Sequence, residues 1–246
     1  MILFYQPELS TGATWLPEDE SRHCVKVLRK REGEAITVTD GRGFFYDCTI
    51  TNANPMKCGL AINAKRESNK KTHSIHIAIA PTKSPDRMEW FVEKVTEMGI
   101  DEITLMDCEH SERTFLKTER LQKVAISAMK QSQQALLPFL YSLYTLENTF
   151  QVDSVIEFIY YVFFLVDAVQ KFIAYVDHTN PKHLASTAIK GKSCLVLIGP
   201  EGDFSTTELQ HAQQTGFEKV SLGSTRLRTE TAGLVACSIL TVLNNS

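Results

Sequence analysis

Residues 194–205 read Cys-Leu-Val-Leu-Ile-Gly-Pro-Glu-Gly-Asp-Phe-Ser, and the prediction of the fold starts from this stretch. The apolar run Cys194–Ile198 predicts a buried strand, and Ser205 with Glu208 predicts a capping box that opens a helix. In parallel α/β sheets, ligands bind beyond the carboxyl ends of the strands, where glycine lets the backbone approach them closely. The stretch is neither a P-loop nor a G-x-G-x-x-G fingerprint, which disfavours a nucleotide triphosphate or a dinucleotide. An ordinary βα turn would show the same spacing.

A second segment of similar design covers residues 221–232, Ser-Leu-Gly-Ser-Thr-Arg-Leu-Arg-Thr-Glu-Thr-Ala. The end of a strand, Gly223, a loop and the start of a helix follow one another. Arg226 and Arg228 stand beside the predicted helix N-terminus, which favours anions by itself. An anionic ligand, an RNA phosphate or a salt-bridged surface loop would each account for the two arginines.

From residue 73 onward, strands alternate with amphipathic helices. Asp86 with Glu89 predicts another capping box, and Gly99 is placed where the helix should stop. Apolar spacing predicts helices around residues 88–98, 121–129 and 232–243, and strands at residues 74–80, 102–106, 172–176 and 219–222. Such alternation implies a mainly parallel sheet covered on both faces. Residues 139–169 fit either a buried helix or strands.

Residues 1–72 are predicted to form a separate, β-rich domain. Ala35–Thr39 and residues 43–51 and 59–64 are short runs rich in β-branched and aromatic residues. Asp40-Gly41, between the first two runs, is a strong hairpin signal. Short strands at this spacing favour a small barrel. The polar stretch 67–72 is typical of a linker, so the predicted domains are 1–72 and 73–246.

The composition is that of an ordinary globular protein, with 246 residues, 43% of them hydrophobic, and a formal net charge of -3. It excludes a disordered or collagen-like chain, and it requires any nucleic-acid partner to meet a local basic patch.

No apolar run reaches the roughly 18–20 residues of a membrane span, and the first residues lack the basic region of a signal peptide. We therefore expect a cytoplasmic protein with no membrane contact. The six cysteines show no metal-binding spacing, so we expect reduced core thiols and no metal.

The two C-terminal segments together resemble the RsmE family of 16S ribosomal RNA (uracil-N3) methyltransferases in the SPOUT superfamily, through LIGPEG followed by LG-x-x-x-LR-x-ETA. Residues 23–43 are similar to the family pattern H-x-x-x-V-L-R…G…DG-x-G, and residues 83–103 to K…RME…K-x-x-E-x-G…I. Further matches are Ser111 with Arg113 and Gln131-Ser132 with Pro138. The chain departs from the pattern at Gln134, where many relatives carry arginine, and at Arg226, where an apolar residue is common.

This resemblance implies a small N-terminal PUA-like β-barrel that holds RNA, followed by an α/β SPOUT domain with a C-terminal trefoil knot. It also implies a homodimer, and S-adenosylmethionine as the cofactor. The positions that match the motifs, together with Val176 from the loop after Phe172–Tyr175, give the expected cofactor-binding set: Val176, Ile198, Gly199, Glu201, Gly202, Leu222, Gly223, Leu227 and Arg228.

The implied reaction is methyl transfer to N3 of a specific uridine (the U1498 type) in 16S rRNA of the small ribosomal subunit. N3 lies on the Watson–Crick edge, so the base must be unpaired or flipped out, and its proton must be removed or its anion stabilised. Arg228 is the first candidate to stabilise the anion, and Arg113 the second, acting across the dimer. Glu201 and Glu230 could accept the proton, although an acid near a helix start is favourable in any case.

RNA binding is expected in the N-terminal domain, at a basic stretch without acids that contains Arg22, Lys26, Arg29, Lys30 and Arg31. If all five met phosphates of unpaired RNA, the logarithm of the binding constant would fall with the logarithm of salt concentration with a slope of about -3.5, from about -0.7 per contact. A solvated basic face is the simpler explanation. For the whole chain, the alternative is a non-catalytic RNA-binding protein with a degenerate cofactor site.

Overall fold

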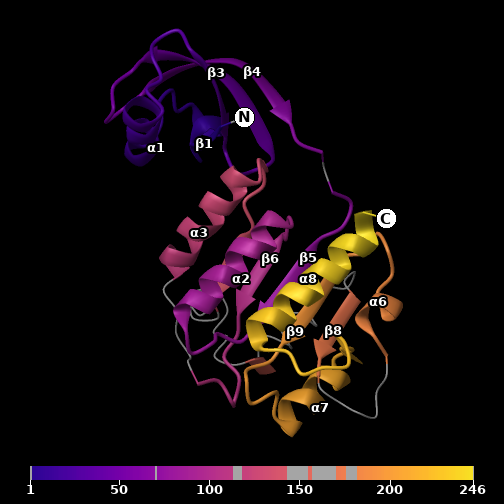
Figure 1. Ribbon diagram of the computed structural model, residues 1–246. Coiled ribbons are helices and arrows are strands. Elements are labelled where there is room, and N and C mark those ends of the chain that lie inside the picture. The colour runs from indigo at the N-terminus through magenta and orange to yellow at the C-terminus, as the bar shows by residue number, and fades with distance from the viewer. Residues whose placement is uncertain are drawn as a thin grey trace. The chain divides into compact units, whose positions relative to one another are not determined.

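The structure, a computed structural model, describes residues 2–69, 71–112, 118–142, 155–156, 170–175 and 182–245. The chain divides into two compact units (Figure 1). Unit 1 contains Met1–Lys70 and Ala125–Leu137, and unit 2 contains Lys71–Val124 and Pro138–Ser246. Residues 125–137 therefore belong with the N-terminal unit, although the sequence division at residue 72 would assign them to the second domain.

Unit 1 is built on a four-stranded sheet in the order β1-β2-β3-β4. Its strands are β1 (Leu3–Tyr5), β2 (Ala35–Thr39), β3 (Phe44–Asn52) and β4 (Gly59–Glu67). β1 pairs with β2 in parallel, whereas β2, β3 and β4 form antiparallel pairs. The strands predicted for this region are therefore present, and the predicted Asp40-Gly41 hairpin connects β2 to β3. β1 was not predicted, because three residues are too short to show a period.

The hairpin turn of unit 1 is held by residues from far along the chain. Gly41 has φ +74°, a conformation that glycine adopts without strain, and a Cβ here would lie 2.9 Å from the Tyr5 ring. Its carbonyl accepts a hydrogen bond from the Leu137 amide at 2.9 Å, and the Ala135 carbonyl accepts one from Gly43 at the same distance. These bonds explain why residues 125–137 cluster with unit 1.

Three short helical segments lie between β1 and β2. They are the 3-10 segment η1 (Leu9–Thr11), α1 (Glu18–Arg22) and, directly after α1, a π-helical segment η2 (His23–Val27). Cys24 packs in the core of unit 1 with Phe4, Leu16 and Val38, whereas Arg22 and Lys26 are exposed. The basic stretch is therefore partly helical, which its sequence alone did not predict.

Unit 2 contains a six-stranded sheet in the order β10-β8-β9-β5-β6-β7, and every pairing is parallel. The strands are β5 (Ile75–Ile79), β6 (Glu102–Leu105), β7 (Phe139–Ser142), β8 (Gln170–Ala174), β9 (Cys194–Ile198) and β10 (Glu218–Val220). Every residue of β9 is buried, as expected for the centre of a parallel sheet covered on both sides. The predicted parallel α/β sheet is confirmed.

The helices of unit 2 in the described ranges are α2 (Pro85–Glu97), α3 (Thr118–Gln131), α6 (Leu184–Thr187), α7 (Thr206–Gln214) and α8 (Thr229–Asn245). The second half of α3 clusters with unit 1. α2 and α8 lie side by side, and α8 also contacts β5 and β9 (Figure 1). A second core cluster joins Ala78 and Leu197 of the sheet to Phe204 and to Leu209 of α7. The α7 capping box at Ser205 and Glu208 is present as predicted.

One predicted capping box is wrong. The N-cap of α2 is Ser84, which makes no side-chain cap bond, and Pro85 occupies the first helical turn. The Glu89 carboxylate, expected to bond back to Asp86, instead lies 2.5 Å from the Arg120 guanidinium of α3. Proline at this position has no amide proton, which removes one of the donors that a helix start leaves unpaired.

β7 and residues 155–156 are the described parts of the segment 139–169 that the sequence left unassigned. Residues 143–154 and 157–169 of it lie outside the described part of the chain, as does Val176 after β8. Across the described ranges, no helix combines the length and the apolar character needed to cross a bilayer.

Candidate functional site

A cavity of about 640 Å³ lies in unit 2 beyond the carboxyl end of β9. Four parts of the chain line it: the end of β8, the turn after β9, the loop before α8 with the first turns of that helix, and the start of α2. The lining residues are Lys83, Ser84, Arg87, Ala174, Ile198, Gly199, Pro200, Glu201, Asp203, Arg226, Leu227, Arg228, Thr229 and Ala232. The two segments singled out in the sequence therefore share one cavity.

The predicted cofactor residues separate into three groups. Ile198, Gly199, Glu201, Leu227 and Arg228 line the cavity. Gly202, Leu222 and Gly223 are in the same two segments but outside the lining. Val176, and also Arg113 from the catalytic set, lie outside the described residues.

Two side-chain bonds hold the two segments against each other. The Thr229 hydroxyl, at the start of α8, donates to the Gly199 carbonyl at 3.1 Å. The Arg226 guanidinium donates to the Glu201 carbonyl at 2.9 Å. Arg226 is therefore bonded to the backbone of the facing turn. This bond gives Arg226 a structural role besides any attraction for an anion.

Arg87 of α2 contributes charge from a third direction. Its Nη1 donates to Oε1 of Glu201 at 3.2 Å, and its Nε lies 3.8 Å from Oε1 of Glu230. The Glu230 side chain is only 8% exposed, and its Oε2 has no hydrogen-bond partner among the described residues. One guanidinium thus contacts both carboxylates that the sequence nominated as proton acceptors.

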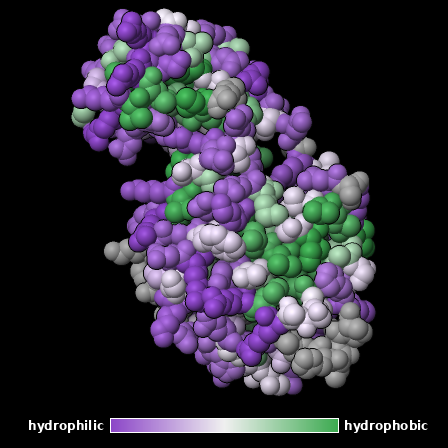
Figure 2. Space-filling view, in the orientation of Figure 1, coloured by the Kyte–Doolittle hydropathy of each residue, from purple (hydrophilic) through white to green (hydrophobic). Residues whose placement is uncertain are grey.

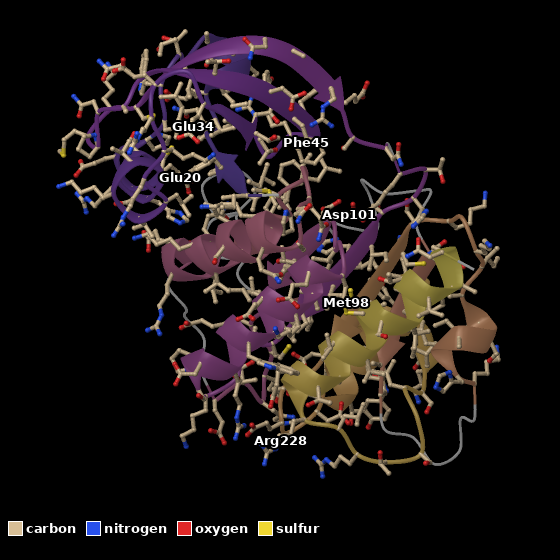
Figure 3. All side chains as sticks on the ribbon, turned by 45° about the horizontal axis from the view of Figure 1, so that its top comes forward. Glu20, Glu34, Phe45, Met98, Asp101 and Arg228 are labelled. Atoms are coloured by element: carbon tan, nitrogen blue, oxygen red, sulfur yellow. The ribbon has the colours of Figure 1, made fainter. Side chains whose placement is uncertain are left out.

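Arg228 lies at the N-terminal end of α8, as Figure 3 shows, far from the labelled Met98 and Asp101 of the same unit. Its carbonyl accepts the helical bond from the Ala232 amide at 2.8 Å, whereas its side chain is exposed and lines the cavity. Its guanidinium has no side-chain partner in the described parts of the chain. Arg228 therefore combines a cation with the positive end of a helix dipole, a combination suited to developing negative charge.

Asp203 adopts φ +65°, which is uncommon for a residue with a side chain. The conformation is stabilised locally, because the Asp203 carboxylate accepts a bond from the Phe204 amide at 2.9 Å. Its carbonyl lies 3.0 Å from Nδ1 of His110, and a Cβ on Gly202 would lie 3.0 Å from Cβ of the same histidine. Gly202 thus allows the loop after β6 to pack closely against the turn.

The basic stretch of unit 1 is less uniformly available than its sequence suggests. Arg22 pairs with Glu18 at 2.5 Å, and Lys30 pairs with Glu34 at 3.0 Å. Lys26, Arg29 and Arg31 are exposed. Arg29 has φ +56°, in the left-handed region, so it marks a sharp change of chain direction after η2.

All six cysteines are buried and free, as expected. Burial raises the pKa of Cys24 and Cys237 to about 12 and that of Cys48 and Cys194 to about 11. These thiols are protonated at neutral pH and are therefore poor nucleophiles and poor metal ligands. Within the described ranges, no three His, Cys, Asp or Glu residues gather as a metal site would require.

Sequence reasoning missed the part of the cavity contributed by α2. Lys83, Ser84 and Arg87 follow β5, the strand that pairs with β9. Neighbouring parallel strands end at the same edge, so these residues meet the turn after β9. In the sequence, Arg87 belongs only to the RME motif of residues 83–103, and the signal that points to the cavity is its position just after the central strand β5.

Comparisons with known proteins match both units of the chain to RNA methyltransferases. A family model described as an RNA methyltransferase domain matches residues 68–241, and one described as an RNA methyltransferase PUA domain matches residues 16–58. A Bacillus subtilis (strain 168) protein named ribosomal RNA small subunit methyltransferase E is 26% identical over 235 residues, which cover 90% of this chain and 87% of that protein.

Solved structures match the chain over nearly its whole length. The crystal structure of a "probable rRNA-methyltransferase" from Porphyromonas gingivalis is 40% identical, has a TM-score of 0.88, and is matched over 100% of this chain and 99% of that one. A ribosomal RNA small subunit methyltransferase E from Neisseria gonorrhoeae, bound to S-adenosyl methionine, is 26% identical with a TM-score of 0.77. That match covers 99% of this chain and 98% of that one.

Proposed function

The chain belongs to the RNA methyltransferase family whose domain model matches residues 68–241, and we propose that it methylates N3 of one uridine, of the U1498 type, in 16S rRNA. It is an rRNA methyltransferase of the RsmE type that uses S-adenosylmethionine. The observation that carries the finer proposal is the shared cavity, because residues of both family segments line it beyond the end of β9. Residues 16–58, N-terminal to the residues that line this cavity, match a PUA domain model.

The cavity fits the cofactor in size and chemistry. Its volume of about 640 Å³ is within the range of about 300–1,000 Å³ typical of small-molecule sites. Ile198, Leu227 and Ala174 offer apolar contacts, and the turn at Gly199 brings backbone close to a ligand. Charged side chains complete the lining, as a ligand with a charged amino-acid end requires. We assign the predicted residues that line the cavity, together with Val176, Gly202, Leu222 and Gly223, to cofactor binding.

When bound, S-adenosylmethionine supplies a methyl group already activated by its sulfonium charge. The chain must then hold the uracil N3 in line with that group, and alignment of this kind is worth up to about 7–11 kcal/mol. Arg228 stabilises the negative charge that develops when N3 loses its proton. Glu201 accepts that proton, and Arg113 is the second cation, contributed across the dimer.

The proposed RNA contacts are Arg22, Lys26, Arg29 and Arg31 of unit 1, within the 16S rRNA of the small subunit. Lys26, Arg29 and Arg31 are exposed, and Arg22 would have to exchange Glu18 for a phosphate. We assign the four-stranded sheet of this unit to a PUA-like β-barrel, for which the antiparallel β2-β3-β4 meander is the support.

The trefoil knot and the homodimer are part of the same proposal. The path of α8 supports a knot, because this helix contacts the central strands β5 and β9 although the preceding strand, β10, lies at the edge of the sheet. The surface of α8 supports a dimer. Figure 2 shows hydrophobic side chains gathered over this helix, and Val242 on it is 64% exposed.

The deciding experiment is a tritium-methyl transfer assay on small ribosomal subunits from cells that lack the protein, followed by nucleoside mass spectrometry. The expected product is N3-methyluridine at a single position. Another methylated nucleoside would overturn the assigned chemistry. An absence of turnover, together with an absence of heat on titration of the folded protein with S-adenosylmethionine, would indicate a non-catalytic RNA-binding protein instead.

A further inference from the structure

Arg87, a residue that the proposed mechanism does not use, is the centre of a cluster of charged side chains. This side chain comes from α2, outside both family segments that form the turn after β9 and the start of α8. It nevertheless lines the cavity and contacts an acid from each segment, Glu201 at 3.2 Å and Glu230 at 3.8 Å.

The two contacts use different nitrogen atoms of one planar group. Nη1 donates to Glu201, and Nε faces Glu230. A guanidinium presents its donors as a rigid fork, so a fixed position of one contact constrains the other. A lysine ammonium, which is a point charge on a flexible stem, could satisfy one acid but could not hold both in this geometry.

The burial of Glu230 makes Arg87 necessary at this place. The Glu230 side chain is 8% exposed, and its Oε2 lacks a hydrogen-bond partner among the described residues. A buried carboxylate needs a compensating charge, and in the described part of the chain Arg87 is the cation beside it. Because Glu230 occupies the first turn of α8, it holds Arg87 next to the residues that follow Arg228.

We propose that Arg87 is a positioning residue for the methyl-donor pocket, because it ties the turn after β9 to the start of α8 and so fixes the distance between the two walls. The inference rests on the proposed function, since it assigns the pocket to S-adenosylmethionine. Arg87 acts through Glu201 and Glu230, and the proposal requires no contact between Arg87 and the cofactor.

The test measures the affinity for S-adenosylmethionine by titration calorimetry in the wild-type protein and in Arg87→Lys. The expected result is a dissociation constant raised by about tenfold or more, the size of a lost charge-assisted hydrogen bond. Arg87→Ala should bind more weakly still, and millimolar guanidinium, far below denaturing concentrations, should restore part of its affinity. Because Arg87→Ala leaves Glu230 buried without its cation, the double variant Arg87→Ala/Glu230→Gln provides a second comparison if the single variant does not fold.

Arg120→Ala is the matched control. Arg120 also faces two carboxylates of α2, Asp86 at 3.7 Å and Glu89 at 2.5 Å, but it does not line the cavity. The affinity of this variant for S-adenosylmethionine should stay within about twofold of wild type, because neither Arg120 nor the two carboxylates that it faces line the cavity. Wild-type affinity in Arg87→Lys, or an equal loss in Arg120→Ala, would overturn the inference. A wild-type protein that binds no S-adenosylmethionine would instead refute the proposed function from which the inference starts.

Discussion

At the scale of single residues, Arg228 is the side chain on which the proposed chemistry depends most. Arg228→Ala should lower kcat by about 100-fold, the usual effect of losing one preorganised donor from a charge-stabilising site. Its affinity for RNA should change much less. Single-turnover methylation and filter binding on the same RNA measure the two quantities, and Arg228→Lys should retain part of the rate. A loss of RNA affinity larger than the loss of turnover would contradict this role.

His76, on β5, makes the stability of unit 2 depend on pH. Burial lowers the pKa of His76 to about 4, and its Nε2 lies 2.8 Å from the Thr104 hydroxyl. In the folded chain His76 stays neutral down to pH about 4, whereas in the unfolded chain it is protonated below pH about 6.5. The contribution of His76 to the free energy of unfolding is therefore fully present above pH about 6.5. It falls by up to about 3 kcal/mol as the pH decreases to about 4.

Denaturant unfolding of the wild type and of His76→Gln between pH 4 and 7 checks this prediction. The neighbouring Glu102 also titrates, and burial raises its pKa, so stability tends to fall as the pH rises through that group. The difference between the two proteins removes the contribution of Glu102 to first order. A difference in unfolding free energy that does not change with pH would show that His76 is not the titrating group.

The residues of the site were predictable only where they belong to a local motif. Gly199, Glu201 and Leu227 line the cavity, and each lies in a segment that the local sequence marks, either a glycine-rich turn after a strand or the loop before a helix. Arg87 could not be placed, because its contacts with Glu201 and Glu230 depend on strand order and helix packing. These are tertiary properties that the spacing of residues along the chain does not contain.

At the scale of elements, Gly233 allows α8 to pack against α2. A Cβ at this position would lie 2.6 Å from the Phe91 ring and 3.0 Å from Cδ1 of Ile79, and both of these side chains are fully buried. Gly233→Ala should therefore destabilise the protein by about 1–3 kcal/mol through overpacking. The higher helix propensity of alanine should offset about 1 kcal/mol of this loss. Ser238→Ala in the same helix should change stability by no more than about 0.5 kcal/mol.

Urea denaturation provides the measurement, and a double-mutant cycle with Phe91→Leu tests the cause. Removing part of the ring should make Gly233→Ala less costly, which gives a favourable coupling energy. Additive effects would show that the cost does not arise from this contact.

The strands of this chain were easier to predict than the beginnings of its helices. Ala35–Thr39 and Cys194–Ile198 were predicted with the bounds that the structure gives, because turn residues flank each apolar run. The capping box of α7 was also found, whereas that of α2 was wrong, since Glu89 binds Arg120 on another helix. The π-helical segment His23–Val27 has no sequence signal of its own.

At the scale of the whole molecule, the division into two units predicts separate effects on RNA and on cofactor. Arg29→Ala should weaken RNA binding and lower the slope of the salt dependence by about 0.7, which corresponds to one phosphate contact. Its affinity for S-adenosylmethionine should match that of the wild type, because Arg29 belongs to unit 1 and the cavity to unit 2.

Fluorescence anisotropy with a single-stranded RNA at several salt concentrations gives the slope, and calorimetry gives the cofactor affinity. Glu18→Gln is an informative companion, because it should release Arg22 from its ion pair and leave RNA binding equal or stronger. A cofactor defect in Arg29→Ala without an RNA defect would reverse the assignment of the two units.

The place of β9 between β5 and β8 has a consequence for how the chain acquires its structure during synthesis. Ile75 pairs with Cys194, so the central seam of the sheet joins segments that leave the ribosome far apart in time. Until residue 198 has emerged, β5 has an open edge, and such edges promote aggregation. Contacts between such distant parts of a chain also slow folding, so the nascent chain should stay prone to aggregation until residue 198 has been made.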